Sequence, residues 1–131
     1  MTQYPDRAAR LKTRRDFLRL RQGRKAARPG VVVQAMAREH DPDGPARAGF
    51  TATKKIGGSV ERNRARRRLR EAVRLLLPEY GASGTDYVFI ARAQTASRPW
   101  TGLLDDVKSA LITLAPPGRA ENHPSSDGSG T

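Results

Sequence analysis

Basic side chains that can bind phosphate are concentrated in one stretch near the middle of the chain. They stand at Lys54, Lys55, Arg62, Arg64, Arg66, Arg67, Arg68 and Arg70, with Asn63 among them. A guanidinium group hydrogen-bonds two phosphate oxygens at once and also stacks on bases, while an amide donates and accepts together. The chemistry predicted for this stretch is recognition of a polyanion.

Candidate catalytic and metal-binding groups are scarce and scattered. The chain has no cysteine, which excludes disulfides, thiolate zinc sites and cysteine nucleophiles. His40 and His123 stand alone among loop and tail residues, and Asp105 and Asp106 are expected on the exposed side of the last helix. The Gly57-Gly58 turn lacks the spacing of loops that cradle nucleotides. We therefore predict no catalytic residue and no metal site in the protein.

The overall charge agrees with a polyanionic partner. The 131 residues include 25 lysines and arginines against 13 acids, a net charge of +12, and a second basic cluster covers residues 7–28. So large an excess favours nucleic acid over an anionic membrane. No segment resembles a signal peptide or is apolar enough for a membrane span, so we expect a cytoplasmic protein.

One domain is expected over residues 1–115, of which 1–9 should be flexible. Hydrophobic residues make up 37% of the chain, enough for a modest core. The last residues read PPGRAENHPSSDGSGT and are polar and small. Because such a segment buries too little to offset its ordering entropy, we predict a disordered tail over 116–131.

Apolar spacing, caps and breakers predict an α+β sandwich. We expect a short helix after Thr13, a long central helix from Ser59 to about Leu77, and a last helix after Pro99. Pro78 should stop the central helix. Strands are expected over 31–37, 47–53 and 87–91. The first two should pair as antiparallel neighbours across the turn-rich sequence between them.

The central helix is predicted to pack on one side and to bind on the other. Its apolar stripe consists of Ala65, Leu69, Ala72, Val73 and Leu76. At about 100° per residue, the side chains opposite the stripe are Asn63, Arg64, Arg67 and Arg74. Arg68 and Arg70 flank this outer face, and Arg62 and Arg66 lie nearer the apolar edge. The basic face could be merely solvated, but like charges three and four residues apart destabilise a helix. So dense a set without acidic partners therefore favours a bound polyanion.

The same stretch resembles the signature of a known family. In bacterial ribonuclease P protein components, a Lys-Lys-x-Gly turn precedes an Arg-Asn-Arg helix, and here the matching run is TKKIGGSVERNRARRRLRE. The flanking runs LKTRRDFLRL, GFTATKK and DYVFIAR resemble that family's first helix, a strand and a later strand. The resemblance covers roughly residues 10–114.

The resemblance implies a specific fold. The element order would be αβββαβα, with a four-stranded sheet and a left-handed βαβ crossover through the Arg-Asn-Arg helix, as in some ribosomal proteins. A further short strand would then lie around residues 25–27, where spacing alone does not indicate one.

The resemblance also implies a function. The protein would be the accessory subunit of ribonuclease P, an endonuclease that removes the 5′ leader of precursor tRNA. One copy would bind the catalytic RNA and the leader, while the RNA would carry the catalysis and hold most of the Mg2+.

By position, two groups of residues inherit roles from the family. The RNA-facing role falls on Lys54, Lys55, Arg62, Asn63, Arg64, Arg66, Arg67, Arg68 and Arg70. The leader cleft inherits Phe17, Gln34, Thr51, Thr53 and Arg92.

The chain departs from the family pattern at two cleft positions. A second aromatic residue often follows Phe17 by one turn, but Leu20 and Arg21 stand there, and Gln34 occupies a position that is often aromatic. Fewer stacking platforms would shift leader binding toward phosphate contacts and make it more sensitive to salt. Phe17 could equally be a core residue.

Two other classes of protein fit part of the pattern. A ribosome-associated or architectural RNA-binding protein would have the same composition, because phosphate contacts carry no sequence identity. A DNA-binding basic helix of the leucine-zipper type would need leucine heptads after the basic run, and these are missing.

Overall fold

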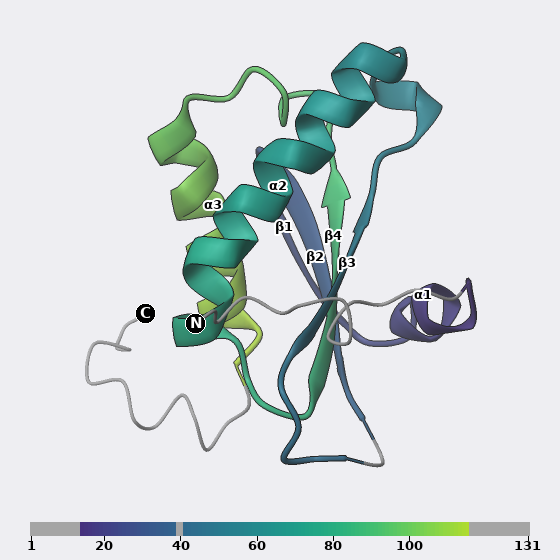
Figure 1. Ribbon diagram of the computed structural model, residues 1–131, viewed down its shortest axis with the longest axis vertical. Helices are drawn as coiled ribbons and strands as arrows, with labels where there is room; N and C mark the ends of the chain where they lie inside the picture. Colours follow the sequence, from purple (N-terminus) through teal and green to yellow (C-terminus); the bar gives the residue numbers. More distant parts are fainter. Residues whose placement is uncertain (1–13, 39–40, 116–131) are drawn as a thin grey trace.

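A four-stranded sheet forms the middle of the protein, and helices cover both of its faces (Figure 1). The computed structural model describes residues 14–38 and 41–115. The elements are α1 (Arg14–Leu20), β1 (Arg24–Arg28), β2 (Val31–Ala37), β3 (Arg47–Thr51), the 3-10 turn η2 (Lys54–Ile56), α2 (Ser59–Tyr80), β4 (Thr85–Ala91) and α3 (Trp100–Thr113). The α+β class and the order αβββαβα are confirmed, including the short strand expected around 25–27. The expected flexible segment 1–9 and tail 116–131 lie outside the described residues.

The strand order differs from the sequence-based prediction. The order is β1-β2-β4-β3, so β4 lies between the two strands that were expected to pair with each other. β4 is antiparallel to β2 and parallel to β3. Its sequence, TDYVFIA, is the most continuously apolar of the four, and a central place buries both of its faces. The parallel pair β3 and β4 is joined through α2, and the left hand of that crossover stays a prediction.

Alternation along the strands separates a large core from a small one. On one face, Val33 and Phe89 belong to a core that includes Leu69 of α2 and Val107 of α3. On the other face, Leu20 of α1 packs with Val88, Met36 and Ile90. Figure 1 shows the same layers, with α2 and α3 on one side of the sheet and α1 on the other.

Both ends of α2 differ from the prediction. Gly58, and not Ser59, is the N-cap, and the Glu61 carboxylate accepts a hydrogen bond from the Gly58 N–H at 3.1 Å. Pro78 does not stop the helix, which continues to Tyr80. A proline in the last turn removes one hydrogen bond, and the packing of Tyr80 against the core and the Gly81 N–H bond to the Leu77 carbonyl hold that turn in place.

Asp106 of α3 was expected to be exposed and is instead buried. Its carboxylate accepts hydrogen bonds from the Gly30 N–H, at 2.9 Å, and from the Arg98 guanidinium. A carboxylate is buried where donors satisfy it, and here the donors come from the β1–β2 turn and from the segment before α3. Helical spacing alone does not reveal such distant donors.

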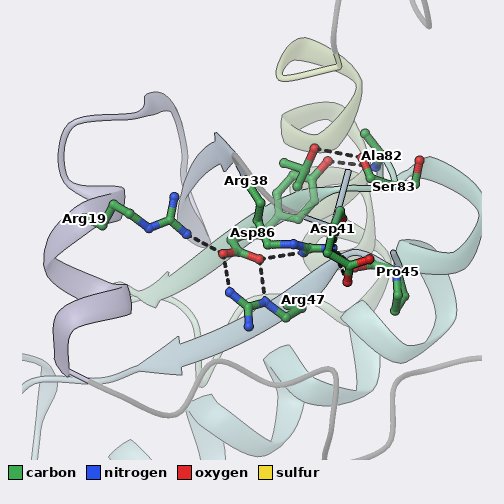
Figure 2. Close-up of polar contacts among 10 residues, drawn as sticks. Arg19, Arg38, Asp41, Pro45, Arg47, Ala82, Ser83 and Asp86 are labelled. Carbon is green, nitrogen blue, oxygen red and sulfur yellow. Dashed lines mark hydrogen bonds and ion pairs between the residues drawn. The ribbon is translucent and has the colours of Figure 1, made fainter. Parts of the chain in front are cut away.

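The buried carboxylate of Asp86 joins four segments of the chain. It lies on β4 and is fully buried, and Figure 2 shows three arginines directed toward it. Arg38, at the end of β2, donates to Oδ1 at 2.8 Å, and Arg47, at the start of β3, donates to both oxygens at 2.7 Å. Arg19 of α1 donates to Oδ2. The cluster therefore ties α1 and the facing ends of β2 and β3 to the central strand.

The same cluster controls the protonation of Asp86. Burial alone raises the pKa of this carboxyl, but the hydrogen bonds and charges of Arg47 and Arg38 outweigh burial and hold the pKa below its ordinary value. In the unfolded chain the carboxyl titrates at about pH 3.9. Its contribution to folding is therefore complete above that pH and is lost as the pH falls toward the lowered native pKa.

Replacing Asp86 should destabilise the protein strongly at neutral pH. Asp86→Asn places an amide N–H against guanidinium donors and removes the buried carboxylate that these groups bind, which costs about 3–5 kcal/mol of the free energy of unfolding. Urea denaturation followed by far-UV circular dichroism at pH 7 and at about pH 3 measures this cost. The gap between wild type and variant should shrink below about pH 4, because the unfolded wild-type chain then binds a proton at this carboxyl that the native carboxylate, with its lowered pKa, does not bind.

Asp105→Asn provides the matched control. Asp105 is an exposed carboxylate of α3, so the same chemical change there should barely alter stability at either pH. A gap between wild type and Asp86→Asn that stayed constant from pH 7 to pH 3 would contradict the role of the charged carboxylate.

Candidate nucleic-acid interface

The outward face of α2 is formed by the residues predicted for it. Asn63, Arg64, Arg67 and Arg74 are exposed, while Ala65, Leu69, Ala72, Val73 and Leu77 are buried on the opposite side. Leu77 replaces Leu76 in the buried stripe, and Leu76 is half-buried. Packing against the sheet and α3 therefore fixes which side chains of α2 face away from the protein.

Arg64 and Arg67 are the available guanidinium groups at the centre of this face. Within residues 14–38 and 41–115, neither makes a hydrogen bond, an ion pair or a ring contact. Arg74, farther along the helix, instead forms an ion pair with Glu71 at 2.5 Å. All donors of Arg64 and Arg67 can therefore be directed at a bound phosphate without breaking a contact in this part of the protein.

Arg62 and Arg66 lie nearer the apolar edge of α2, as predicted, and both are half-buried. Arg62 makes a long contact with the Gly58 carbonyl, at 3.4 Å. Arg66 donates to the amide oxygen of Asn63 at 2.8 Å. That bond orients the Asn63 amide, which can still donate through its nitrogen to a phosphate or a base.

Arg68 and Arg70 also contact other parts of the protein. The guanidinium carbon of Arg70 lies 5.8 Å from the centre of the Phe50 ring. Arg68 reaches the segment between β4 and α3, where it donates to the carbonyls of Thr95 and Arg98, both at 2.6 Å. Burial lowers the pKa of Arg68, and the charge of Arg64 lowers it further.

Lys54 and Lys55 extend the basic surface beyond the helix. Both are exposed in η2, immediately before the glycines that lead into α2. Gly57 has a φ of +141°, and a Cβ at this position would lie 2.9 Å from the Cβ of Glu61. Only glycine fits this conformation, so the close turn that brings the two lysines to the start of α2 depends on it.

The predicted cleft residues are brought together only in part. Gln34 of β2 and Thr51 of β3 pair with Val88 and Ile90 of β4, on the face of the sheet that α1 covers. Gln34 is buried and Thr51 is half-buried. Phe17 belongs to α1, but its side chain lies outside the described part of the structure.

Thr53 and Arg92 lie at the margins of that face. Thr53 is exposed just before η2. Arg92 is exposed directly after β4, and its Nη1 donates to the Arg28 carbonyl at 2.8 Å. It borders an open depression of about 540 Å³, whose other lining residues are Ala27, Arg28, Pro29, Ala93 and Gln94.

Two exposed arginines of α1 were not among the predicted site residues. Arg14 and Arg15 are exposed and, together with Arg19, line a depression of about 600 Å³ next to Leu18 and Gln22. The sequence indicated only that this region is basic. Whether a residue on so short a helix faces a cleft depends on how the helix sits on the sheet, which its spacing does not reveal.

The chain matches known proteins over most of its length. The family model for ribonuclease P matches residues 6–115. The ribonuclease P protein component of Caulobacter vibrioides is 57% identical over 106 residues, which cover 81% of this chain and 70% of that protein. The corresponding protein of Ruegeria pomeroyi is 49% identical over 108 residues, covering 82% and 86%.

Solved structures share the fold. The Staphylococcus aureus RNase P protein superimposes with a TM-score of 0.67 at 25% identity, over 82% of this chain and 95% of that one. The Thermotoga maritima RNase P protein gives a TM-score of 0.66 at 24% identity, over 82% and 98%. The sheet and helices described above therefore follow an established arrangement.

Removing either available arginine should weaken binding to a folded RNA and reduce its dependence on salt. We expect Arg64→Ala and Arg67→Ala each to flatten the slope of log K against log salt concentration by about one unit, since each removes one phosphate contact. Filter binding or fluorescence anisotropy over a salt series measures the slope, and circular dichroism checks that α2 stays folded.

Arg74→Ala is the control for this pair. It removes the same charge from the same helix, but from a side chain already paired with Glu71. Its slope should stay closer to that of the wild type. Equal slopes for wild type, Arg64→Ala and Arg67→Ala would refute the predicted phosphate contacts.

Proposed function

The chain belongs to the bacterial ribonuclease P protein family and is a subunit of ribonuclease P in tRNA processing, and we propose that two of its surfaces bind different RNAs. The outward face of α2, together with Lys54 and Lys55, binds the RNA subunit of the enzyme. The face of the sheet under α1 receives the 5′ leader of precursor tRNA.

The assignment of α2 to binding of the RNA subunit rests on the contrast between the two sides of this helix. Its inner side is packed without exposed surface, while Arg64 and Arg67 on its outer side have no partner among the described residues. A rigid helix presents these groups at a fixed spacing, so little backbone entropy is lost when phosphates bind. Asn63 adds further hydrogen-bond donors on the same face of α2.

The leader assignment rests on the polar and basic side chains on and around the opposite face. The half-buried Thr51 offers a hydroxyl beside the apolar Ile90, and the buried Gln34 lies next to Val88 on the same face. The exposed guanidinium of Arg92 and those of Arg14 and Arg15 can bind the backbone of a single strand. Direct contact with precursor tRNA, in one copy of the protein per RNA subunit, is part of this proposal.

We assign the chemical step to the RNA subunit. Among the described residues, no three histidines, cysteines or acids lie close enough together to hold a metal ion. The carboxylates at the centre of the fold, Asp86 and Asp106, are already satisfied by arginines. The Mg2+ that hydrolysis requires is therefore assigned to the RNA, and the protein contributes substrate affinity and screens repulsion between two polyanions.

The protein is proposed to act in the cytoplasm, where tRNA precursors are made. In the described part of the chain, no helix has both the length and the apolar character to cross a membrane.

The protein should restore cleavage of precursor tRNA by a bacterial ribonuclease P RNA at low magnesium concentration. Under these conditions repulsion between the RNA subunit and the substrate is poorly screened, so a cationic subunit has its largest effect. Gel analysis of a 5′-extended precursor, with and without the protein, measures both the rate and the position of the new 5′ end.

A variant with Arg62, Asn63 and Arg64 replaced by alanine should lose this stimulation, while Asp105→Asn should retain it. Tight RNA binding by the wild-type protein without any stimulation would contradict the processing role. It would favour the ribosome-associated or architectural class of RNA-binding protein.

A further inference from the structure

The segment between β4 and α3, residues 92–99, is held by an unusually complete set of hydrogen bonds. At its centre Thr95 is fully buried. The Thr95 hydroxyl donates to the Gly30 carbonyl at 2.7 Å and accepts from the Arg92 N–H, also at 2.7 Å. The segment is thereby fixed to the β1–β2 turn, and Arg92 is fixed with it.

A second set of bonds attaches this segment to α3. The Arg98 guanidinium binds the Asp106 carboxylate, which also accepts the Gly30 N–H. The turn at Gly30 is therefore bound both by Thr95 and by Asp106. A Cβ at Gly30 would lie 2.7 Å from Asp106 Oδ2, which shows how closely these groups approach.

The attachment to α2 is made by Arg68. Its two terminal nitrogens donate to two different carbonyls of the segment, those of Thr95 and Arg98, both at 2.6 Å. Its guanidinium carbon also lies 5.7 Å from the centre of the Trp100 ring. In contrast, the adjacent Arg67 is exposed and makes no such contact within the described residues.

We propose that Arg68 is a positioning residue that holds the 92–99 segment, and with it Arg92, against the RNA-binding helix, and that it is not itself a contact to RNA. The carbonyls of Thr95 and Arg98 accept hydrogen bonds from both terminal nitrogens of Arg68, so these nitrogens are not available to a phosphate. The consequence for the leader rests on the proposed function, because Arg92 is the residue through which Arg68 would act.

The geometry requires an arginine. A planar guanidinium can donate from both terminal nitrogens to two separated carbonyls and still lie over an aromatic ring. A lysine ammonium keeps the charge on a shorter, tetrahedral head that does not reproduce this fork. Arg68→Lys therefore separates charge from positioning, and Arg68→Met removes both.

Trp100 gives a direct readout of the attachment, because it is the only tryptophan of the chain. Acrylamide quenching of its fluorescence should rise in Arg68→Met and in Arg68→Lys, since both free the ring and the adjoining segment. It should stay at the wild-type value in Arg67→Met. Unchanged quenching in both Arg68 variants would overturn the attachment, whatever the protein does to RNA.

Binding and cleavage test the consequence. Arg68→Met should bind ribonuclease P RNA with the wild-type salt slope, whereas Arg67→Met should lose about one unit of slope. In cleavage of a precursor tRNA with a long leader, both Arg68 variants should raise the KM of the enzyme for this substrate about tenfold, with little change in kcat. For a precursor with a single-nucleotide leader, the KM should not rise. Arg92→Met should have the same leader-dependent effect, and Arg68→Met combined with Arg92→Met should be no worse than either alone.

Three results would overturn the proposal. The first is that Arg68→Met lowers the salt slope of RNA binding as much as Arg67→Met does. The second is that Arg68→Lys has the wild-type affinity for the long-leader precursor, and the third is that the effects of Arg68→Met and Arg92→Met on KM are additive. If the wild-type protein failed to stimulate cleavage at all, the proposed function would fall. The quenching experiment would still decide whether Arg68 holds the segment.

Discussion

The buried carboxylate of Asp86 is the interaction on which the arrangement of the sheet depends. It lies on the central strand β4 and binds arginines from α1, from the end of β2 and from the start of β3. The two carboxylate oxygens accept from all three guanidinium groups, and this offsets the cost of burying the charge of Asp86. Arg38 also donates to the carbonyls of Asp41 and Pro45, so the same guanidinium group holds residues 41–45, which precede β3 (Figure 2).

The arginines of this chain fall into two functional kinds, according to what surrounds them. Arg38, Arg47 and Arg98 satisfy buried carboxylates, and Arg28 binds the hydroxyls of Ser109 and Thr113 on α3. These residues hold the elements together. Arg64 and Arg67 on the outward face of α2 have no partner among the described residues, so the net charge of +12 overstates the number of cations offered to RNA.

Packing makes the dense basic face of α2 possible. Like charges at helical spacing repel one another and would destabilise an isolated helix. Burial of the inner stripe of α2 against the sheet and α3 offsets this repulsion and keeps the charges in register. Binding of a polyanion then relieves the repulsion, so the same feature that strains the free protein favours the complex.

Features that depend on local periodicity were predictable from the amino-acid sequence. The two sides of α2 and the bounds of β2 follow from spacing along the chain. The resemblance of the basic run added the family and the short β1 strand. These features were predictable because residues three or four apart on a helix, or two apart on a strand, face the same way in any fold.

Contacts between groups far apart in the sequence became known from the folded structure. The insertion of β4 between β2 and β3, the burial of Asp86 and Asp106, and the attachment of Arg68 to the 92–99 segment all join residues far apart in sequence. The charge of an arginine is the same whether it faces RNA or a buried carbonyl, so residue type does not distinguish these roles. The partner of each guanidinium is set by long-range packing, because its position in space depends on how the sheet and helices come together.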